Sequence, residues 1–183
     1  EYVFLIDDEA FIDGPRMIEL ARAIKAAGIR KRFFAYCRVD SIIREQEVLR
    51  EWTDIGLERL MVGIDAISEK DLTEYKKAYG SSRIEEALEI ADKLGIEILA
   101  QFVVNTDYTK KDFKYLSRFV EHHKIQYPSF TVLTPIPGTD IYNLDKIIER
   151  QPNNRPNWDY FDTQNAVVKT ALPKEEFRKE YRG

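Results

Sequence analysis

The chain opens with Tyr2-Val3-Phe4-Leu5-Ile6-Asp7-Asp8, an apolar run that passes directly into acidic residues. Short runs of this kind, rich in Val, Ile and aromatic residues, are typical of strands. Four further runs follow the same plan, and each passes into polar or turn-forming residues: 33–37, 59–64, 98–104 and 129–133. Strands that alternate with helices favour βαβ units and a parallel sheet. The sequence therefore predicts an α/β fold.

Amphipathic helix patterns separate these strands. The first opens at Asp13-Gly14-Pro15, where Asp13 or Gly14 serves as the cap, and it ends at Gly28. Other helices are predicted over 46–55, from Ser68, from Ser82, from Thr109 and over 141–150. Residues 151–157 are polar and proline-rich, which indicates a boundary. We therefore expect a main domain over 1–150 and a C-terminal extension over 151–183.

Composition excludes several classes of protein. The net charge is −4 and no basic stripe is present, so nucleic-acid binding has little electrostatic support. A single cysteine cannot form an intrachain disulfide, which fits a reducing cytoplasm. No apolar run approaches the roughly 20 residues that span a bilayer, so no membrane span is expected. Because the chain begins on a strand without an initiator Met, we expect further sequence upstream.

Polar side chains gather where the predicted strands end, the position at which parallel α/β barrels carry their chemistry. Asp7 and Asp8 end the first strand, Arg38 and Asp40 follow the second, and Asp65 follows the third. Each has a structural alternative. Asp7 and Asp8 suit a solvated turn, Arg38 and Asp40 suit a salt bridge across neighbouring loops, and Asp65 suits a local turn contact.

The last two strands carry polar groups of another kind. Gln101 places an amide within an apolar strand, so a neighbouring side chain or a ligand must satisfy it. Asn105 follows that strand, and Thr134-Pro135 opens a rigid turn after the last one. Such a turn either offers main-chain groups to a planar ring or redirects the chain. His122 and His123 are adjacent on a helix and point about 100° apart, which disfavours a shared metal ion.

Taken in order, these motifs resemble the radical S-adenosylmethionine (SAM) superfamily, in the branch that often carries a cobalamin-binding domain upstream. The resemblance covers nearly the whole chain and rests on five segments: Asp7-Asp8-Glu9-Ala10-Phe11, Arg38-Val39-Asp40, Gly63-Ile64-Asp65-Ala66, Thr134 to Thr139, and Trp158 to Asp162. Two features depart from the family. The Cys-x-x-x-Cys-x-x-Cys loop is absent, and Val104-Asn105-Thr106-Asp107 replaces a turn rich in Gly and Pro.

The resemblance implies a partial (βα)6-type, TIM-like barrel in which five parallel βα units are present, corresponding to the family's second to sixth strands. It also implies SAM as cofactor, a [4Fe–4S] cluster with its ligands upstream, and cobalamin through an upstream domain. Such enzymes cleave SAM to a 5′-deoxyadenosyl radical, and the cofactor supplies that chemistry. We expect a small-molecule substrate, which the sequence does not identify.

The resemblance also assigns residues to the SAM pocket. Asp7 and Asp8 correspond to the position that contacts the methionine amino group, and Asp65 to the position near the ribose. The methionine carboxylate pairs with a basic residue among Lys76, Lys77 and Arg83. Asn105 and Pro135 border the adenine, and Arg38, Asp40 and Gln101 complete the set.

Two other functions remain open on the sequence. One is a metal-dependent α/β-barrel lyase or hydrolase that uses Asp7, Asp40 and Asp65, and the other is a non-catalytic binding module. Three clustered cysteines upstream would favour the radical SAM enzyme. In addition, the first strand is apolar on both faces, so we expect this edge to self-associate or to be covered by a short strand at 166–168.

Overall fold

The computed structural model describes residues 1–65, 67 and 81–183. Within them the chain forms two compact units. The first unit comprises Glu1–Phe102 and Glu121–Ser129, and the second comprises Val103–Val120 and Phe130–Gly183. No helix among the described residues is long and apolar enough to cross a membrane.

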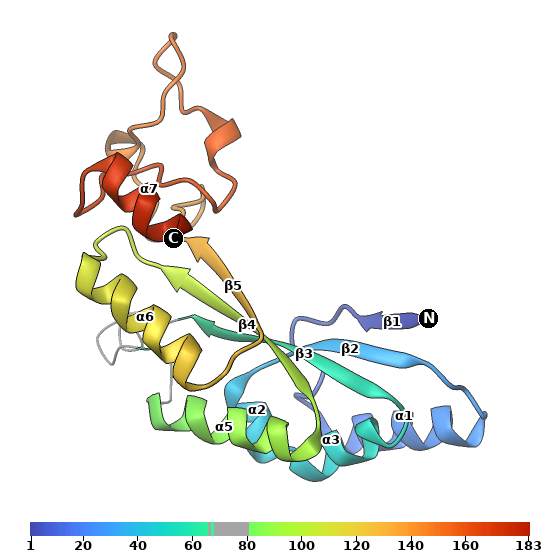
Figure 1. Cartoon of the computed structure of the whole chain (residues 1–183). Coiled ribbons are helices and arrows are strands. Elements are labelled where there is room, and N and C mark those ends of the chain that lie inside the picture. Colours follow the sequence, from blue (N-terminus) through green and yellow to red (C-terminus); the bar gives the residue numbers. More distant parts are fainter. Residues whose placement is uncertain (66, 68–80) are drawn as a thin grey trace. The chain divides into compact units, whose positions relative to one another are not determined.

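The strands form one five-stranded sheet in the order β1-β2-β3-β4-β5 (Figure 1). The pairs β1–β2, β2–β3 and β3–β4 are all parallel. The predicted α/β fold with a parallel sheet is therefore confirmed. The strands are β1 (Tyr2–Leu5), β2 (Arg32–Cys37), β3 (Leu57–Asp65), β4 (Glu97–Val104) and β5 (Tyr127–Val132).

Helices alternate with the strands, as the sequence predicts. They are α1 (Gly14–Ala26), α2 (Val39–Arg44), α3 (Gln46–Thr53), α5 (Ser81–Leu94), α6 (Lys110–His122) and α7 (Lys174–Arg182). The helix start expected at Ser68 lies outside the described residues. The helix expected over 141–150 is wrong: only a short 3-10 helix forms, at Leu144–Lys146. Ile147 instead pairs antiparallel with Val168, so the strand expected at 166–168 is reduced to an isolated bridge.

Local capping explains where α1 and α6 begin. Asp13 caps α1, because its Oδ1 accepts a hydrogen bond from the Arg16 amide at 3.1 Å. Thr109 precedes α6, and both its amide and its hydroxyl donate to Asp112 Oδ2 at 2.7 Å. These contacts satisfy backbone groups that a helix N-terminus leaves without partners.

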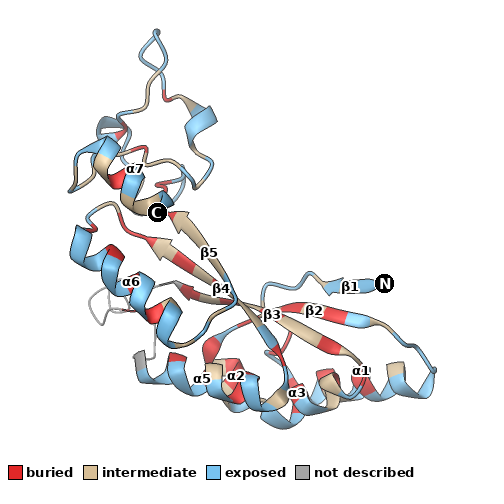
Figure 2. Cartoon of the chain, viewed as in Figure 1, coloured by how far each residue is buried: buried red, intermediate tan, exposed pale blue. Residues whose placement is uncertain are grey.

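The core of the first unit lies between the sheet and its helices, where buried residues gather (Figure 2). Alternate residues of β2 point into it, namely Phe33, Ala35 and Cys37. Trp52 of α3 is fully buried, and its indole N–H donates to the Met17 carbonyl at 2.9 Å. Its ring meets Phe11 and Phe33 edge-on, with centroids 5.9 and 5.3 Å apart. Trp52 thus joins α1, α3, β2 and the loop after β1.

The second unit has a smaller core of its own. Phe113 of α6 packs edge-on against Tyr108 and against Phe177 of α7, with ring centroids 5.7 and 5.4 Å apart. Lys110 and Glu176 form an ion pair at 2.5 Å between the same two helices. Val167 is fully buried, and its carbonyl accepts from the Ile148 amide at 2.9 Å. Residues 151–183 therefore pack with α6.

Candidate functional site at the strand ends

The first unit brings the predicted strand-end residues of β1 and β2 to one edge of the sheet, because the two strands are parallel and in register. Asp7 and Asp8 follow β1 and are exposed. Arg38 follows β2, and Asp40 lies in the first turn of α2. Together with Glu9, these residues are called the strand-end cluster below.

Arg38 and Asp40 form a bidentate ion pair. Arg38 Nε donates to Asp40 Oδ1 at 2.8 Å, and Nη2 donates to Oδ2 at 3.2 Å. This hydrogen bond to Arg38 is the main reason why the pKa of Asp40 lies below its ordinary value. The expected salt bridge is confirmed, but its geometry differs from the prediction. The pair closes within one turn and does not span neighbouring loops.

Glu9 is the acidic residue that turns inward. It is half-buried, and its Oε1 accepts from the Phe11 amide at 3.3 Å. Burial raises the pKa of its carboxyl, and the nearby charge of Asp40 adds to that rise. The Ser41 hydroxyl and the amides of Arg38 and Phe11 oppose it. The sequence grouped Glu9 with Asp7 and Asp8 at the strand end but did not predict its burial, because the apolar residues that follow it were the only sign.

Cys37 ends β2 next to this carboxyl. Burial raises the pKa of its thiol far above the ordinary value, and the charge of Glu9 contributes. Its Sγ donates to the Arg38 carbonyl at 3.6 Å. The thiolate is the form of cysteine that binds metals and attacks electrophiles, so this thiol is unsuited to either role.

Asp65 is the last residue of β3, beside an irregularity in the sheet. Gly63 is in register with Gln101, whereas Asp65 is in register with Phe102, so Ile64 is the extra residue of a bulge. Bulges redirect the residues that end a strand. Gln101 is half-buried between Ala100 and Phe102, which are buried, so it lies on the opposite face of the sheet from both.

The remaining predicted residues are distributed as follows. Arg83 lies on α5 and is exposed, whereas Lys76 and Lys77 lie outside the described residues. Asn105 and Pro135 belong to the second unit, where both are buried. There the Asn105 carbonyl accepts from the Tyr108 amide at 3.2 Å, and Leu133 N donates to the Val104 carbonyl at 2.9 Å. The ends of β4 and β5 are thus held together.

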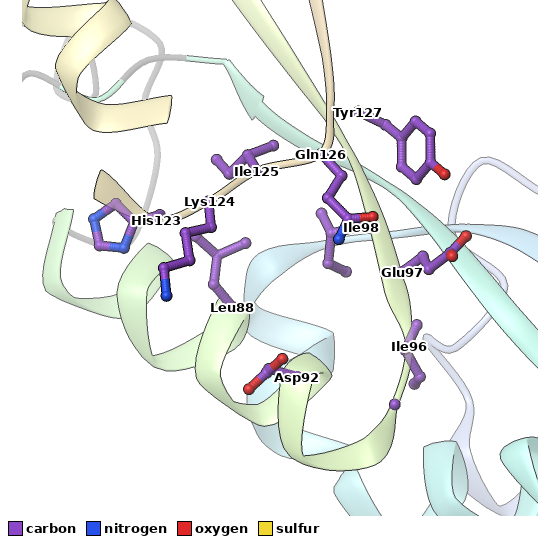
Figure 3. Close-up of a pocket in the computed structure, with 11 residues that line it drawn as sticks. Leu88, Asp92, Ile96, Glu97, Ile98, His123, Lys124, Ile125, Gln126 and Tyr127 are labelled. Carbon is purple, nitrogen blue, oxygen red and sulfur yellow. The ribbon is translucent and has the colours of Figure 1, made fainter. Parts of the chain in front are cut away.

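The sequence did not predict a hollow at the amino end of β4 (Figure 3). Its volume is about 290 Å³, and it is lined by the end of α5, the start of β4 and residues 123–127. Two of its side chains have partners in the protein: Glu97 pairs with Arg59 at 2.5 Å, and His123 Nε2 lies 3.6 Å from Glu85 Oε1. Within the described residues, no group of three or more His, Cys, Asp and Glu side chains is placed to hold a metal ion.

Known proteins resemble this chain along nearly its whole length, although no protein-family model matches it. It is 32% identical over 175 residues to hopanoid C-3 methylase of Methylococcus capsulatus, and the alignment covers 96% of this chain and 33% of that protein. It is 23% identical over 172 residues to bacteriochlorophyllide d C-8(2)-methyltransferase of Chlorobaculum tepidum, covering 92% and 37%. The chain therefore spans about a third of the length of these curated relatives.

Solved structures share the fold. The cobalamin-dependent SAM radical enzyme OxsB matches with a TM-score of 0.56 and 19% identity, over 63% of this chain and 19% of that one. The radical SAM methyltransferase TsrM of Kitasatospora setae matches with a TM-score of 0.55 and 16% identity, over 69% and 26%. The chain is thus similar in sequence to hopanoid C-3 methylase and shares the fold of two radical SAM enzymes, which agrees with the resemblance of its strand-end motifs to that superfamily.

Proposed function

We propose that this chain forms the SAM-binding part of a radical SAM enzyme, with SAM seated on the carboxyl ends of the strands. The observation that carries the proposal is the strand-end cluster, in a chain that is 32% identical over 175 residues to a methylase. Carboxylates and guanidinium groups suit the ammonium, carboxylate and ribose hydroxyls of SAM, because charge-assisted hydrogen bonds are the strongest that proteins make.

Each residue has a proposed role in holding SAM. Asp7 and Asp8 are exposed acceptors for the methionine ammonium, and Asp65 accepts from the ribose hydroxyls. A basic residue among Lys76, Lys77 and Arg83 pairs with the methionine carboxylate. Arg38, which Asp40 orients, and Gln101 complete this side of the pocket.

The iron–sulfur cluster requires ligands from outside this chain. A [4Fe–4S] cluster is held by cysteine thiolates, whereas this chain has one cysteine, which is buried. When bound, such a cluster would supply the electron for reductive cleavage of SAM to methionine and a 5′-deoxyadenosyl radical. The task of this chain is to bind SAM, to orient it and to keep water away.

Methyl transfer is the reaction class that we favour. Two of the proteins similar to this chain are named as a methylase of hopanoid and a methyltransferase of bacteriochlorophyllide, and the structural neighbour TsrM is a radical SAM methyltransferase. The structural neighbour OxsB is cobalamin-dependent. A cyclisation is the second candidate, because the chain is also 25% identical over 171 residues to an anaerobic magnesium-protoporphyrin IX monomethyl ester cyclase of Synechocystis. We place cobalamin in a separate domain of the whole protein.

The finer architecture follows the same proposal. The five parallel strands are the second to sixth strands of a (βα)6-type partial barrel, with residues 1–150 as its body and 151–183 as an extension beside it. The exposed edge of β1, where Tyr2 is 45% and Phe4 40% exposed, is then the side that pairs with another strand. If it stays unpaired, self-association through this edge remains our prediction. We place the whole protein in the cytoplasm.

The test is the formation of 5′-deoxyadenosine. The whole protein is purified without oxygen, its cluster is reconstituted with iron and sulfide, and SAM and a strong reductant are added. We expect 5′-deoxyadenosine to accumulate, and its yield at subsaturating SAM to fall when Asp65 is replaced by Ala. SAM that stays intact with a fully loaded cluster would refute the proposal. A metal-dependent hydrolase would instead show activity without any cluster.

A further inference from the structure

Glu9 lies where the chain passes from solvent into the core. Ile6, Asp7 and Asp8 are exposed, and Ile6 is exposed by 78%. Glu9 is half-buried, and the two residues after it are buried, Phe11 completely. The exposed pair Asp7–Asp8 is therefore held between β1 on one side and a docked tripeptide, Glu9–Phe11, on the other.

The docked tripeptide is fixed by three contacts. The Ala10 amide donates to the Tyr36 carbonyl of β2 at 3.3 Å. The Phe11 ring packs edge-on against Trp52. The Phe11 amide donates to Glu9 Oε1 at 3.3 Å, so that the Glu9 carboxyl closes the turn on itself.

Groups at the end of β2 and on α2 act on the pKa of this carboxyl. The charge of Asp40 adds to its rise, whereas Ser41 and the Arg38 amide oppose it. Glu9 Oε2 is buried and, among the described residues, makes no hydrogen bond. A buried carboxylate oxygen without a partner is costly, so the neutral carboxyl is favoured here. A neutral carboxyl donates from one oxygen while it accepts at the other.

We propose that Glu9 is a positioning residue, which closes the turn after β1 and so holds Asp7 and Asp8 beside the end of β2, where the Arg38–Asp40 ion pair lies. The inference rests on the proposed function, since this cluster is the proposed SAM site. Glu9 itself does not touch SAM. It acts through the two strand-end segments that it holds together.

The test compares variants of the whole, cluster-loaded protein. The SAM dissociation constant is measured by equilibrium dialysis from pH 6 to 9 for the wild type, Glu9→Gln, Glu9→Ala and Ser41→Ala. Glu19→Gln is the matched control, because Glu19 is exposed on α1. Amide hydrogen exchange of residues 8–11 gives a second readout that does not depend on SAM.

We expect Glu9→Ala to weaken SAM binding by about tenfold, the effect of losing one buried hydrogen-bonded tie, and to speed exchange at Ala10 and Phe11. Glu9→Gln keeps an oxygen that accepts from the Phe11 amide. It should bind SAM within about twofold of the wild type at pH 7, where a twofold change is below ~0.5 kcal/mol. It should also lack any loss of affinity that the wild type shows as pH rises through the raised pKa of Glu9. Ser41→Ala should act like Glu9→Ala with a smaller effect, and Glu19→Gln should change nothing.

Three results would overturn the inference. Unchanged exchange at Ala10 and Phe11 in Glu9→Ala would show that the tie does not exist. Binding by Glu9→Gln as weak as by Glu9→Ala would mean that a charged Glu9 contacts the ligand. If Glu9→Ala does not fold, the inference would also be overturned by a Glu9→Gln variant whose SAM dissociation constant changes with pH as that of the wild type does. Failure of the wild type to bind SAM would instead refute the proposed function, and the exchange data would still decide the role of Glu9.

Discussion

At the residue scale, Glu9 makes the stability of the protein depend on pH. The pKa of Glu9 is raised in the folded state, so the folded protein favours the protonated form. Its contribution to stability is fully present below the ordinary carboxyl value of 4.5 and is lost as pH rises through the raised pKa. Asp40, whose pKa is lowered, contributes to stability with the opposite dependence on pH. Because the wild type and Glu9→Gln both contain Asp40, its contribution cancels when the two are compared.

We therefore expect Glu9→Gln to gain stability over the wild type as pH rises. The melting temperatures of the two proteins should be close at pH 4.5, and the variant should melt higher at pH 8, because its amide cannot ionise. Thermal unfolding followed by circular dichroism at both pH values tests this, with Glu19→Gln as the control. A constant difference between variant and wild type across this range would contradict it.

At this scale the sequence indicated which segments end the strands but not which side chain turns inward. Asp7-Asp8 and Arg38-Val39-Asp40 were located because strand ends are visible as a change from apolar to polar residues. The burial of Glu9 was not predicted because it depends on Phe11, which packs against Trp52, a residue 41 positions further along the chain. A contact of that kind follows from tertiary packing and leaves no local pattern. The side chain of Asp65 and residues 68–80 lie outside what the structure describes.

At the element scale, the turn between α3 and β3 depends on a glycine. Gly56 has a φ of +111°, and a Cβ there would meet the Lys31 carbonyl oxygen at 2.1 Å. Gly28, after α1, also has a positive φ, of +67°, but a Cβ there would meet nothing within 4 Å. Substitutions at the two glycines thus distinguish the cost of a positive φ from the cost of a steric clash.

We expect Gly28→Ala to cost roughly 1–2 kcal/mol, the cost of a left-handed conformation for a residue with a Cβ. Gly56→Ala should cost at least about 1–3 kcal/mol more, because the β2 and β3 segments must also move apart. Urea unfolding of the two variants measures the difference. Equal losses of unfolding free energy in the two variants would contradict this, because they would show that the Lys31 carbonyl moves aside without cost.

The packing of α3 provides a second test at this scale. Trp52→Phe keeps most of the aromatic packing but leaves the Met17 carbonyl without its indole donor. We expect a loss of about 1–3 kcal/mol, the cost of leaving a buried polar group unpaired. Trp158→Phe is the matched control, because Trp158 is 50% exposed. A loss in the control as large as that in Trp52→Phe would refute this account of the core.

The order of elements was largely predictable, and the exceptions have physical reasons. Caps such as Asp13 and the alternation of β2 are local signals, and both are confirmed. The helix expected over 141–150 does not form. The backbone of Ile147 and Ile148 is used instead in contacts with residues 167–168, so long-range pairing overrides local propensity.

At the scale of the whole molecule, the central claim is that SAM binds at the carboxyl ends of the strands. The hollow at the amino end of β4 gives this claim an internal comparison, because Asp92 of α5 lines the hollow whereas Asp65 is the last residue of β3. Glu97 and His123 at the hollow are already engaged with Arg59 and Glu85.

The most direct measurement is the SAM dissociation constant of the whole, cluster-loaded protein carrying Asp65→Ala or Asp92→Ala. We predict that Asp65→Ala weakens binding by about 1–3 kcal/mol, the range for a buried polar partner left unpaired, and that Asp92→Ala leaves binding unchanged. Circular dichroism confirms that both variants are folded. An unchanged dissociation constant in Asp65→Ala, or an equal loss in both variants, would contradict a SAM site at the strand ends.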